Sequence, residues 1–183
     1  TICLGDPITF SAAGAGIVGL VWDFGDGTFD SIPSPTHTYG AAGTYEVILS
    51  VISNITLCPS ADTINVTVVT APVVAMTATD SVVCAGESID FNSTGTTGNN
   101  LIFDWMLDGT SFSFQSDPPP QTFNTPGSYT IALVINDQLT GCGDSIAMTI
   151  VVNEMPAASF TLDPVDPCGD PAFIHGTSTS TPA

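Results

Sequence analysis

Apolar and polar side chains alternate along much of this chain, and a period of two is the pattern of β-strands with one buried face. In one clear example, Tyr45, Val47, Leu49 and Val51 form one face and alternate with residues of mixed polarity. Similar alternation recurs in the stretches 8–10, 20–24, 64–68, 89–91, 103–107, 129–136 and 146–152. No segment has a sustained period of 3.6, and Gly, Pro, Asn and Asp punctuate the strands at the short spacing of a sandwich. The pattern predicts an all-β fold.

Several landmarks recur in the same order at a nearly fixed spacing, which is the signature of tandem modules. The recurring pairs are Cys3 and Cys84, Trp22 and Trp105, Tyr45 and Tyr129, and Cys58 and Cys142. We therefore expect a module that lacks its first strand (1–71), a complete module (72–153) and the start of a third (154–183). Since the chain begins at Thr1 without a signal peptide, we interpret it as part of a longer array.

The composition is strongly one-sided, with no Lys or Arg against 18 Asp and Glu and a formal net charge of −18. Nucleic-acid binding depends on Lys and Arg, so we expect no nucleic-acid partner. Anionic membranes are disfavoured for the same reason, and no apolar stretch approaches the ~20 residues that membrane insertion needs. Apolar residues still make up 43% of the chain, so it should bury real cores instead of being disordered.

Three motifs of the first module resemble the signature of the PKD (polycystic kidney disease) domain. They are VWDFGDG at 21–27, HTY at 37–39 and GTYEVILSV at 43–51. The second module departs from the pattern: its segment 105–109 is one residue shorter, and QTF at 121–123 replaces HTY. The resemblance covers nearly the whole chain and implies tandem immunoglobulin-like β-sandwich modules arranged end to end. Acidic arrays with paired cysteines are also similar to the large surface adhesins of gliding Bacteroidota.

The chain has five cysteines, and their pairing indicates whether the protein lies in an oxidising compartment. In an immunoglobulin-like topology Cys3 and Cys84 precede the second strand of their modules, and Cys58 and Cys142 lie in the turn between the last two strands. We expect these positions to share a pole, which pairs Cys3 with Cys58 and Cys84 with Cys142 and leaves Cys168 to a partner beyond residue 183. Buried free thiols are the alternative; a metal site is disfavoured because no CxxC spacing occurs. Disulfides predict an extracellular or cell-surface location.

Asp23, Asp26 and Asp30 cluster around a predicted hairpin and are candidate Ca²⁺ ligands, since calcium takes carboxylate and carbonyl oxygens. The alternative is that Asp26 with its following glycine only supplies the turn. Diffuse binding of divalent cations to the acidic surface is a further possibility. No other cofactor is expected.

Four hydroxyl residues follow an Asp and precede an apolar residue, as in the O-glycosylation acceptor of Bacteroidota: Ser31, Thr63, Ser81 and Ser145. The alternative is that an acid, a β-former and an apolar residue are an ordinary way to enter a strand.

Catalysis is not expected, because a base, a nucleophile and an electrophilic stabiliser must converge and nothing in the sequence brings them together. His37 belongs to the HTY segment, and Tyr45 and Tyr129 suit a tyrosine-corner-like hydrogen bond or a core contact better than a binding site. The leading hypothesis is an extracellular structural or adhesive stalk or filament, with neighbouring modules as partners. Alternatives are a recognition module for an extracellular glycan or protein and a spacer of a secreted hydrolase. Short connectors with a central Pro, 69–74 and 152–157, predict modules joined head to tail.

Overall fold

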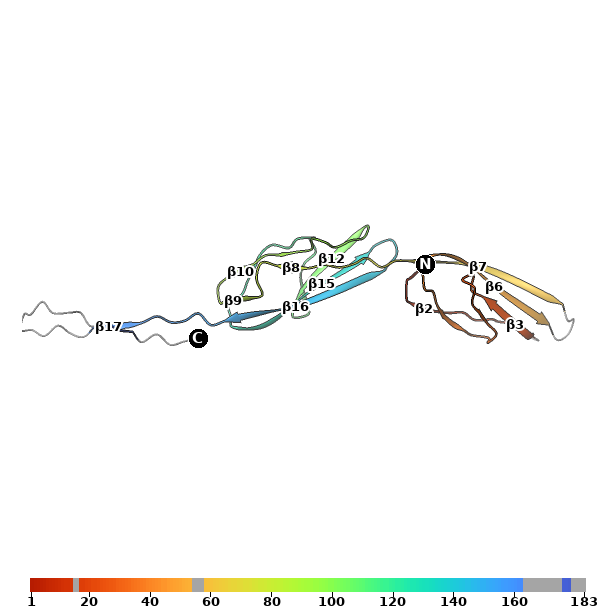
Figure 1. Cartoon of the computed structure of the whole chain (residues 1–183), viewed down its shortest axis with the longest axis horizontal. Coiled ribbons are helices and arrows are strands. Elements are labelled where there is room, and N and C mark those ends of the chain that lie inside the picture. The colour runs from red at the N-terminus through yellow and green to blue at the C-terminus, as the bar shows by residue number, and fades with distance from the viewer. Residues whose placement is uncertain (15–16, 54–57, 163–175, 179–183) are drawn as a thin grey trace, which may run out of the picture.

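The computed structural model describes residues 1–14, 17–53, 58–162 and 176–178. In these ranges every regular element is a β-strand, and no helix is long and apolar enough to cross a membrane. Two β-sandwiches follow one another along the long axis of the molecule, and a short connector joins them (Figure 1). We call the sandwich of β1–β7 the first module and that of β8–β16 the second module.

The first module consists of a five-stranded sheet and a facing two-stranded sheet. The larger sheet has the order β1 (Ile2–Cys3), β7 (Pro59–Val69), β6 (Gly43–Ser53), β3 (Ile17–Asp23) and β4 (Phe29–Asp30), and the smaller pairs β2 (Pro7–Thr9) with β5 (Thr36–Thr38). β1 runs parallel to the end of β7, with Cys3 opposite Val69, while the other pairs are antiparallel.

The second module repeats this sheet and adds one strand pair. Its five-stranded sheet has the order β9 (Val82–Cys84), β16 (Gly143–Asn153), β15 (Gly127–Asp137), β12 (Leu101–Leu107) and β13 (Thr110–Ser113). The short pairs are β10 (Ser88–Ile89) with β14 (Gln121–Thr122), and β8 (Thr77–Ala78) with β11 (Phe91–Asn92). The last described strands, β17 (Phe160–Leu162) and β18 (Gly176–Ser178), form an antiparallel pair.

Each module packs its core around a tryptophan on the central strand. Trp22 on β3 is 5% exposed and Trp105 on β12 is fully buried. The indole N–H of Trp22 donates to the carbonyl of Ile32 at 3.2 Å, and that of Trp105 donates to the carbonyl of Gln115 at 3.0 Å. Burying roughly 200 Å² of aromatic surface stabilises each module by about 5 kcal/mol. The all-β, tandem immunoglobulin-like fold expected from the sequence is confirmed.

The two tyrosines that begin the long alternating strands have the predicted hydrogen bond. The Tyr45 hydroxyl donates to the carbonyl of Ala41 at 2.8 Å, and the Tyr129 hydroxyl donates to the carbonyl of Thr125 at the same distance. Each bond fixes the loop that enters β6 or β15. The tyrosine-corner prediction is therefore confirmed in both modules.

Candidate functional site

A disulfide crosses the junction between the two modules. It joins Cys3 to Cys142, with an S–S distance of 2.01 Å and a Cα–Cα distance of 5.7 Å. Cys3 lies at the end of β1, and Cys142 lies in the β15–β16 hairpin turn, at the pole of the second module that faces the first. In Figure 1 the N-terminus accordingly lies at the joint, beside the tip of that hairpin. We call this bond the junction disulfide.

The junction disulfide contradicts the pairing of Cys3 with Cys58 and of Cys84 with Cys142. Cys58 immediately precedes β7, whereas Cys3 is the lateral neighbour of Val69 at the other end of that strand. The eleven residues of β7, at roughly 3.3 Å each, place those two ends about 36 Å apart. A disulfide needs Cα atoms about 4.4–6.8 Å apart, so the two cysteines of one module cannot meet. The error was to place both positions at one pole of the sandwich.

The second module has the same geometry, with Cys84 opposite Asn153 at the end of β16 and Cys142 just before its start. Cys84 is half-exposed and forms no disulfide with any described residue, and Cys168 lies outside the described residues. The disulfide that the described residues form thus connects the two modules instead of closing one module on itself. The length of the strand between the cysteines was the sequence signal that could have revealed this.

Two covalent links, which lie side by side, connect the two modules at the joint. The backbone leaves the first module at Val69, and the disulfide leaves it at Cys3, one strand spacing or about 4.8 Å away. Two attachment points restrict twisting and bending of one module relative to the other, whereas a single connector would allow rotation about it. The bond also closes a span of 139 residues, which is worth about 5 kcal/mol in the chain-entropy model.

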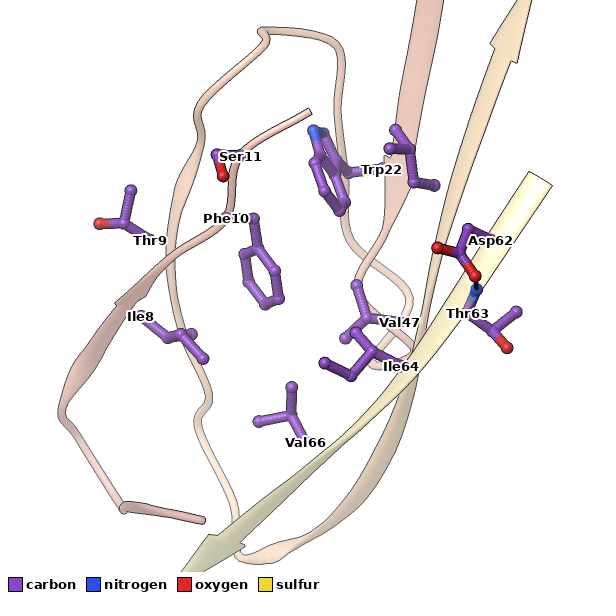
Figure 2. A pocket seen from close by; sticks show the side chains of 11 residues that line it. Ile8, Thr9, Phe10, Ser11, Trp22, Val47, Asp62, Thr63, Ile64 and Val66 are labelled. Carbon is purple, nitrogen blue, oxygen red and sulfur yellow. Dashed lines mark hydrogen bonds between the residues drawn. The ribbon is translucent and has the colours of Figure 1, made fainter. Parts of the chain in front are cut away.

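An apolar groove of about 370 Å³ opens on the first module between its two sheets. Figure 2 shows Ile8 and Phe10 on one wall, with Trp22, Ile64 and Val66 opposite them. We call this hollow the strand groove. Its open side explains why Ile64 is 59% exposed although it belongs to the inward-facing row of β7.

A strand fills the corresponding place in the second module. There β8 pairs with β11, and Phe91 of β11 occupies the position that Phe10 has in the first module. Val74, Met76 and Ala78, on and before β8, pack against the core of the second module. The strand groove therefore has the shape and chemistry of a site for an extended strand with alternating apolar side chains.

The WDFGDG and HTY motifs meet in a polar lock, which we define as Asp26 with His37. His37 Nε2 lies 2.8 Å from Asp26 Oδ2, and its ring stacks on Phe24 with centroids 4.1 Å apart. Partial burial opposes ionisation of Asp26, but hydrogen bonds from the Thr28 hydroxyl and amide and from His37 outweigh it, so the pKa of Asp26 is lowered. In the second module Gln121 replaces the histidine, which leaves the polar lock specific to the first module.

The three candidate calcium ligands do not form a metal-binding group in the described residues. Asp23 accepts a hydrogen bond from the amide of Gly25 at 2.9 Å, and Asp26 is engaged in the polar lock. Asp30 accepts from the amides of Ser31 and Ile32. Their carboxylates accept hydrogen bonds from the backbone of the neighbouring turns, and Ca²⁺ binding at these residues stays a prediction.

The four candidate acceptor hydroxyl residues are all exposed: Ser31, Thr63, Ser81 and Ser145. In each tripeptide the preceding Asp accepts a hydrogen bond from the amide of the Ser or Thr, at 2.6–2.9 Å. The four tripeptides therefore share this hydrogen bond, although Thr63 and Ser145 lie within strands and Ser31 and Ser81 lie outside them. O-glycosylation at these positions stays a prediction.

Comparisons with known proteins agree with the repeat. The family model described as PKD domain matches residues 1–68 and again residues 69–152. A microbial collagenase of Vibrio alginolyticus is 45% identical over 53 residues, which are 26% of this chain and 6% of that protein. Polycystin-1 of Homo sapiens is 28% identical over 153 residues, which are 81% of this chain and 4% of that protein. The chain thus spans a small part of both relatives.

Two solved structures illustrate the similarities that a structural comparison finds. Fibronectin(III)-like modules of Clostridium thermocellum CbhA superpose with a TM-score of 0.45 at 17% identity, covering 84% of this chain and 88% of theirs. An I-band fragment of titin superposes with a TM-score of 0.35 at 15% identity, covering 100% of this chain and 72% of its own.

Proposed function

Because this chain belongs to the PKD domain family across residues 1–152, we propose that it is an extracellular structural spacer, a stiff acidic rod that holds other parts of a surface or secreted protein apart. The observation that carries the proposal is the joint: two modules in line, connected both by backbone and by the junction disulfide (Figure 1). A covalent second link across a module joint has a mechanical purpose that ligand binding does not require.

Charge and redox chemistry support the same function. With a net charge of −18 and no Lys or Arg, like charges on the two modules repel at short range and favour the extended arrangement. A disulfide persists in oxidising surroundings, which is why we propose an extracellular location. An adhesive stalk or filament of a cell surface is one form that such a spacer takes.

The collagenase relative favours a second candidate, a spacer attached to a secreted hydrolase. Both candidates need the same rod, and they differ in what lies at its ends. A glycan-recognition function has less support. The strand groove is mostly apolar, and a strand of the chain itself fills the equivalent place in the second module.

Small-angle scattering of the whole chain tests the rod. β7 is about 36 Å long, so two modules in line span roughly 75 Å, and a rod of that length, before residues 154–183 are added, has a radius of gyration of about 22 Å. A compact chain of 183 residues would have about 16 Å. We expect the larger value in oxidising buffer, with a flexible joint after reduction and in a Cys3→Ser control. A value near 16 Å that salt does not change would contradict the spacer function.

A further inference from the structure

Cys84 occupies in the second module the place that Cys3 occupies in the first. Each lies in a short strand that runs parallel to the end of the last strand, opposite Val69 or Asn153. The amide of the next residue donates to that strand-end carbonyl in both modules, at 2.8 Å from Leu4 and 2.9 Å from Ala85.

The turns that follow the two cysteines are also the same. The Cys3 carbonyl accepts from the amide of Asp6 at 3.0 Å, and the Cys84 carbonyl accepts from the amide of Glu87 at 3.1 Å. Gly5 and Gly86 both have a φ of 94°, a left-handed conformation that favours glycine. The backbone therefore presents both sulfur atoms from equivalent positions at the same pole of their modules.

The two cysteines differ in what faces them. Cys3 is bonded to Cys142 in the β15–β16 hairpin turn of the second module, whereas Cys84 is half-exposed and has no disulfide partner among residues 1–14, 17–53, 58–162 and 176–178. Beside Cys84 the second module has an open hollow of about 620 Å³, whose lining also includes Pro126, Val152 and Pro156. At the equivalent pole of the first module, the β15–β16 hairpin turn brings Cys142 to Cys3.

We propose that Cys84 is a second junction-disulfide site, which takes the cysteine in the last hairpin turn of a module that follows the second. The inference rests on the proposed spacer function, because it makes the two-point joint a repeating feature of the rod. The chemistry is thiol oxidation: two thiols form one S–S bond and transfer two electrons and two protons to an external disulfide. With oxidised glutathione as that oxidant, the by-product is two molecules of reduced glutathione.

Repetition of the bond would limit how far the rod can be stretched. Once Cys84 and Cys142 are both bonded to neighbouring modules, the force crosses the second module through the 58 residues between them. Without the bonds, the force would pass through the whole repeat of about 84 residues. A fully extended chain spans at most about 3.5 Å per residue, so each unfolded module would lengthen to roughly 200 Å where roughly 290 Å is available without the bonds.

The test places a following module after Cys84 without changing the chain before it. A second copy of residues 70–153 is inserted directly after Asn153, which reproduces the connector between Val69 and Val73 at the new joint. The protein is refolded with oxidised and reduced glutathione, alkylated with N-ethylmaleimide and digested with pepsin, since trypsin has no site in a chain without Lys or Arg.

We expect mass spectrometry to find Cys84 of the first copy linked to Cys142 of the second copy. Alkylation of that Cys84 should slow by roughly tenfold or more against the original chain, because a disulfide has no thiolate. Cys84→Ser in the first copy should remove the new link, and the matched Cys84→Ser in the second copy should leave it intact.

The inference is overturned by a first-copy Cys84 that stays reactive while Cys3 and Cys142 are bonded, and by a link from Cys84 to Cys168. Loss of the Cys3–Cys142 bond in the duplicated chain would overturn it as well, because that bond is its template. Scattering of the same sample separates this inference from the spacer function. An extended particle with a reactive Cys84 refutes only the repeating disulfide, whereas a compact particle refutes the spacer.

Discussion

When the oxidised chain is pulled from its two termini, its length should hardly increase, because the junction disulfide carries the force past the residues between Cys3 and Cys142. Tension entering at Thr1 reaches Cys3, crosses to Cys142 and continues to residue 183, so the 139-residue span between the cysteines carries no load. The loaded part of the second module, β16, is already extended at roughly 3.3 Å per residue and can gain only a few Å when it is peeled off.

Reduction of the junction disulfide should allow the residues between the two cysteines to extend. At about 3.5 Å per residue the 139-residue span corresponds to roughly 490 Å, and the folded Cα–Cα separation of its ends is only 5.7 Å. The first module contributes about 230 Å of the gain and the second about 240 Å, since the ends of each loop also lie close together in the folded state. Two steps of this size should therefore appear.

Single-molecule force spectroscopy with handles at both termini measures these steps directly. The oxidised protein is compared with the same protein after a phosphine reductant, and oxidised Cys142→Ser serves as a control that lacks the bond without any reductant. Steps near 230 Å in the oxidised unmodified chain would refute the load path, and so would their absence in the reduced chain. Residues 154–183 contribute equally to every trace and cancel in the comparison.

Three further predictions concern the stability of the modules. Burial, with a smaller effect of the negative Asp26, raises the pKa of Tyr39 to about 12, and its hydroxyl donates to the carbonyl of Phe24 at 3.1 Å. An unfolded tyrosine has a pKa of about 10, so the stability that this shift contributes is complete below pH 10 and is lost as the pH rises through 12. Denaturant unfolding from pH 9 to 12 should show this slope, and Tyr39→Phe should remove it. The lowered pKa of Asp26 acts in the opposite direction, with stability present above the unfolded value near 3.8 and lost as the pH falls. Thr28→Ala should flatten this acid dependence in urea titrations, because the Thr28 hydroxyl makes the largest lowering contribution, and His37→Ala should reduce it less. Trp105→Ala should destabilise the second module by about 3–5 kcal/mol, and calorimetry should show the first module melting separately and nearly unchanged once Cys3 is also replaced by serine.

The fold could be predicted because local chemistry and repetition agree. Alternating apolar residues specify which face of a strand is buried, and a second copy of the same pattern removes most of the ambiguity of a single one. The tryptophan rows and the tyrosine corners followed from the same reasoning. What the repeat could not supply is any relation between copies, since an offset in sequence carries no information about which poles face each other.

The junction disulfide was missed for that reason. Every cysteine of one module has an equivalent in the next, so the spacing is equally consistent with bonds inside modules and bonds between them. The choice depends on strand length: the eleven residues of β7 separate Cys58 from Cys3 by a whole module, while the connector between modules is only a few residues long. The sequence predicted that the first module lacks its first strand, but it did not reveal the strand groove, because the walls of that groove come from strands far apart in the chain.

Charge and the junction disulfide contribute differently to the stiffness of the rod, and each needs the other. At physiological salt the screening length is about 8 Å, so charges on the far ends of two modules about 36 Å long hardly interact. Repulsion can therefore keep the modules from folding against each other, but it cannot set the angle or twist at the joint. The disulfide beside the connector does set them, because it fixes a second point of contact. High salt should accordingly change the scattering of the reduced chain much more than that of the oxidised chain, and equal salt responses would show that the second link adds no stiffness.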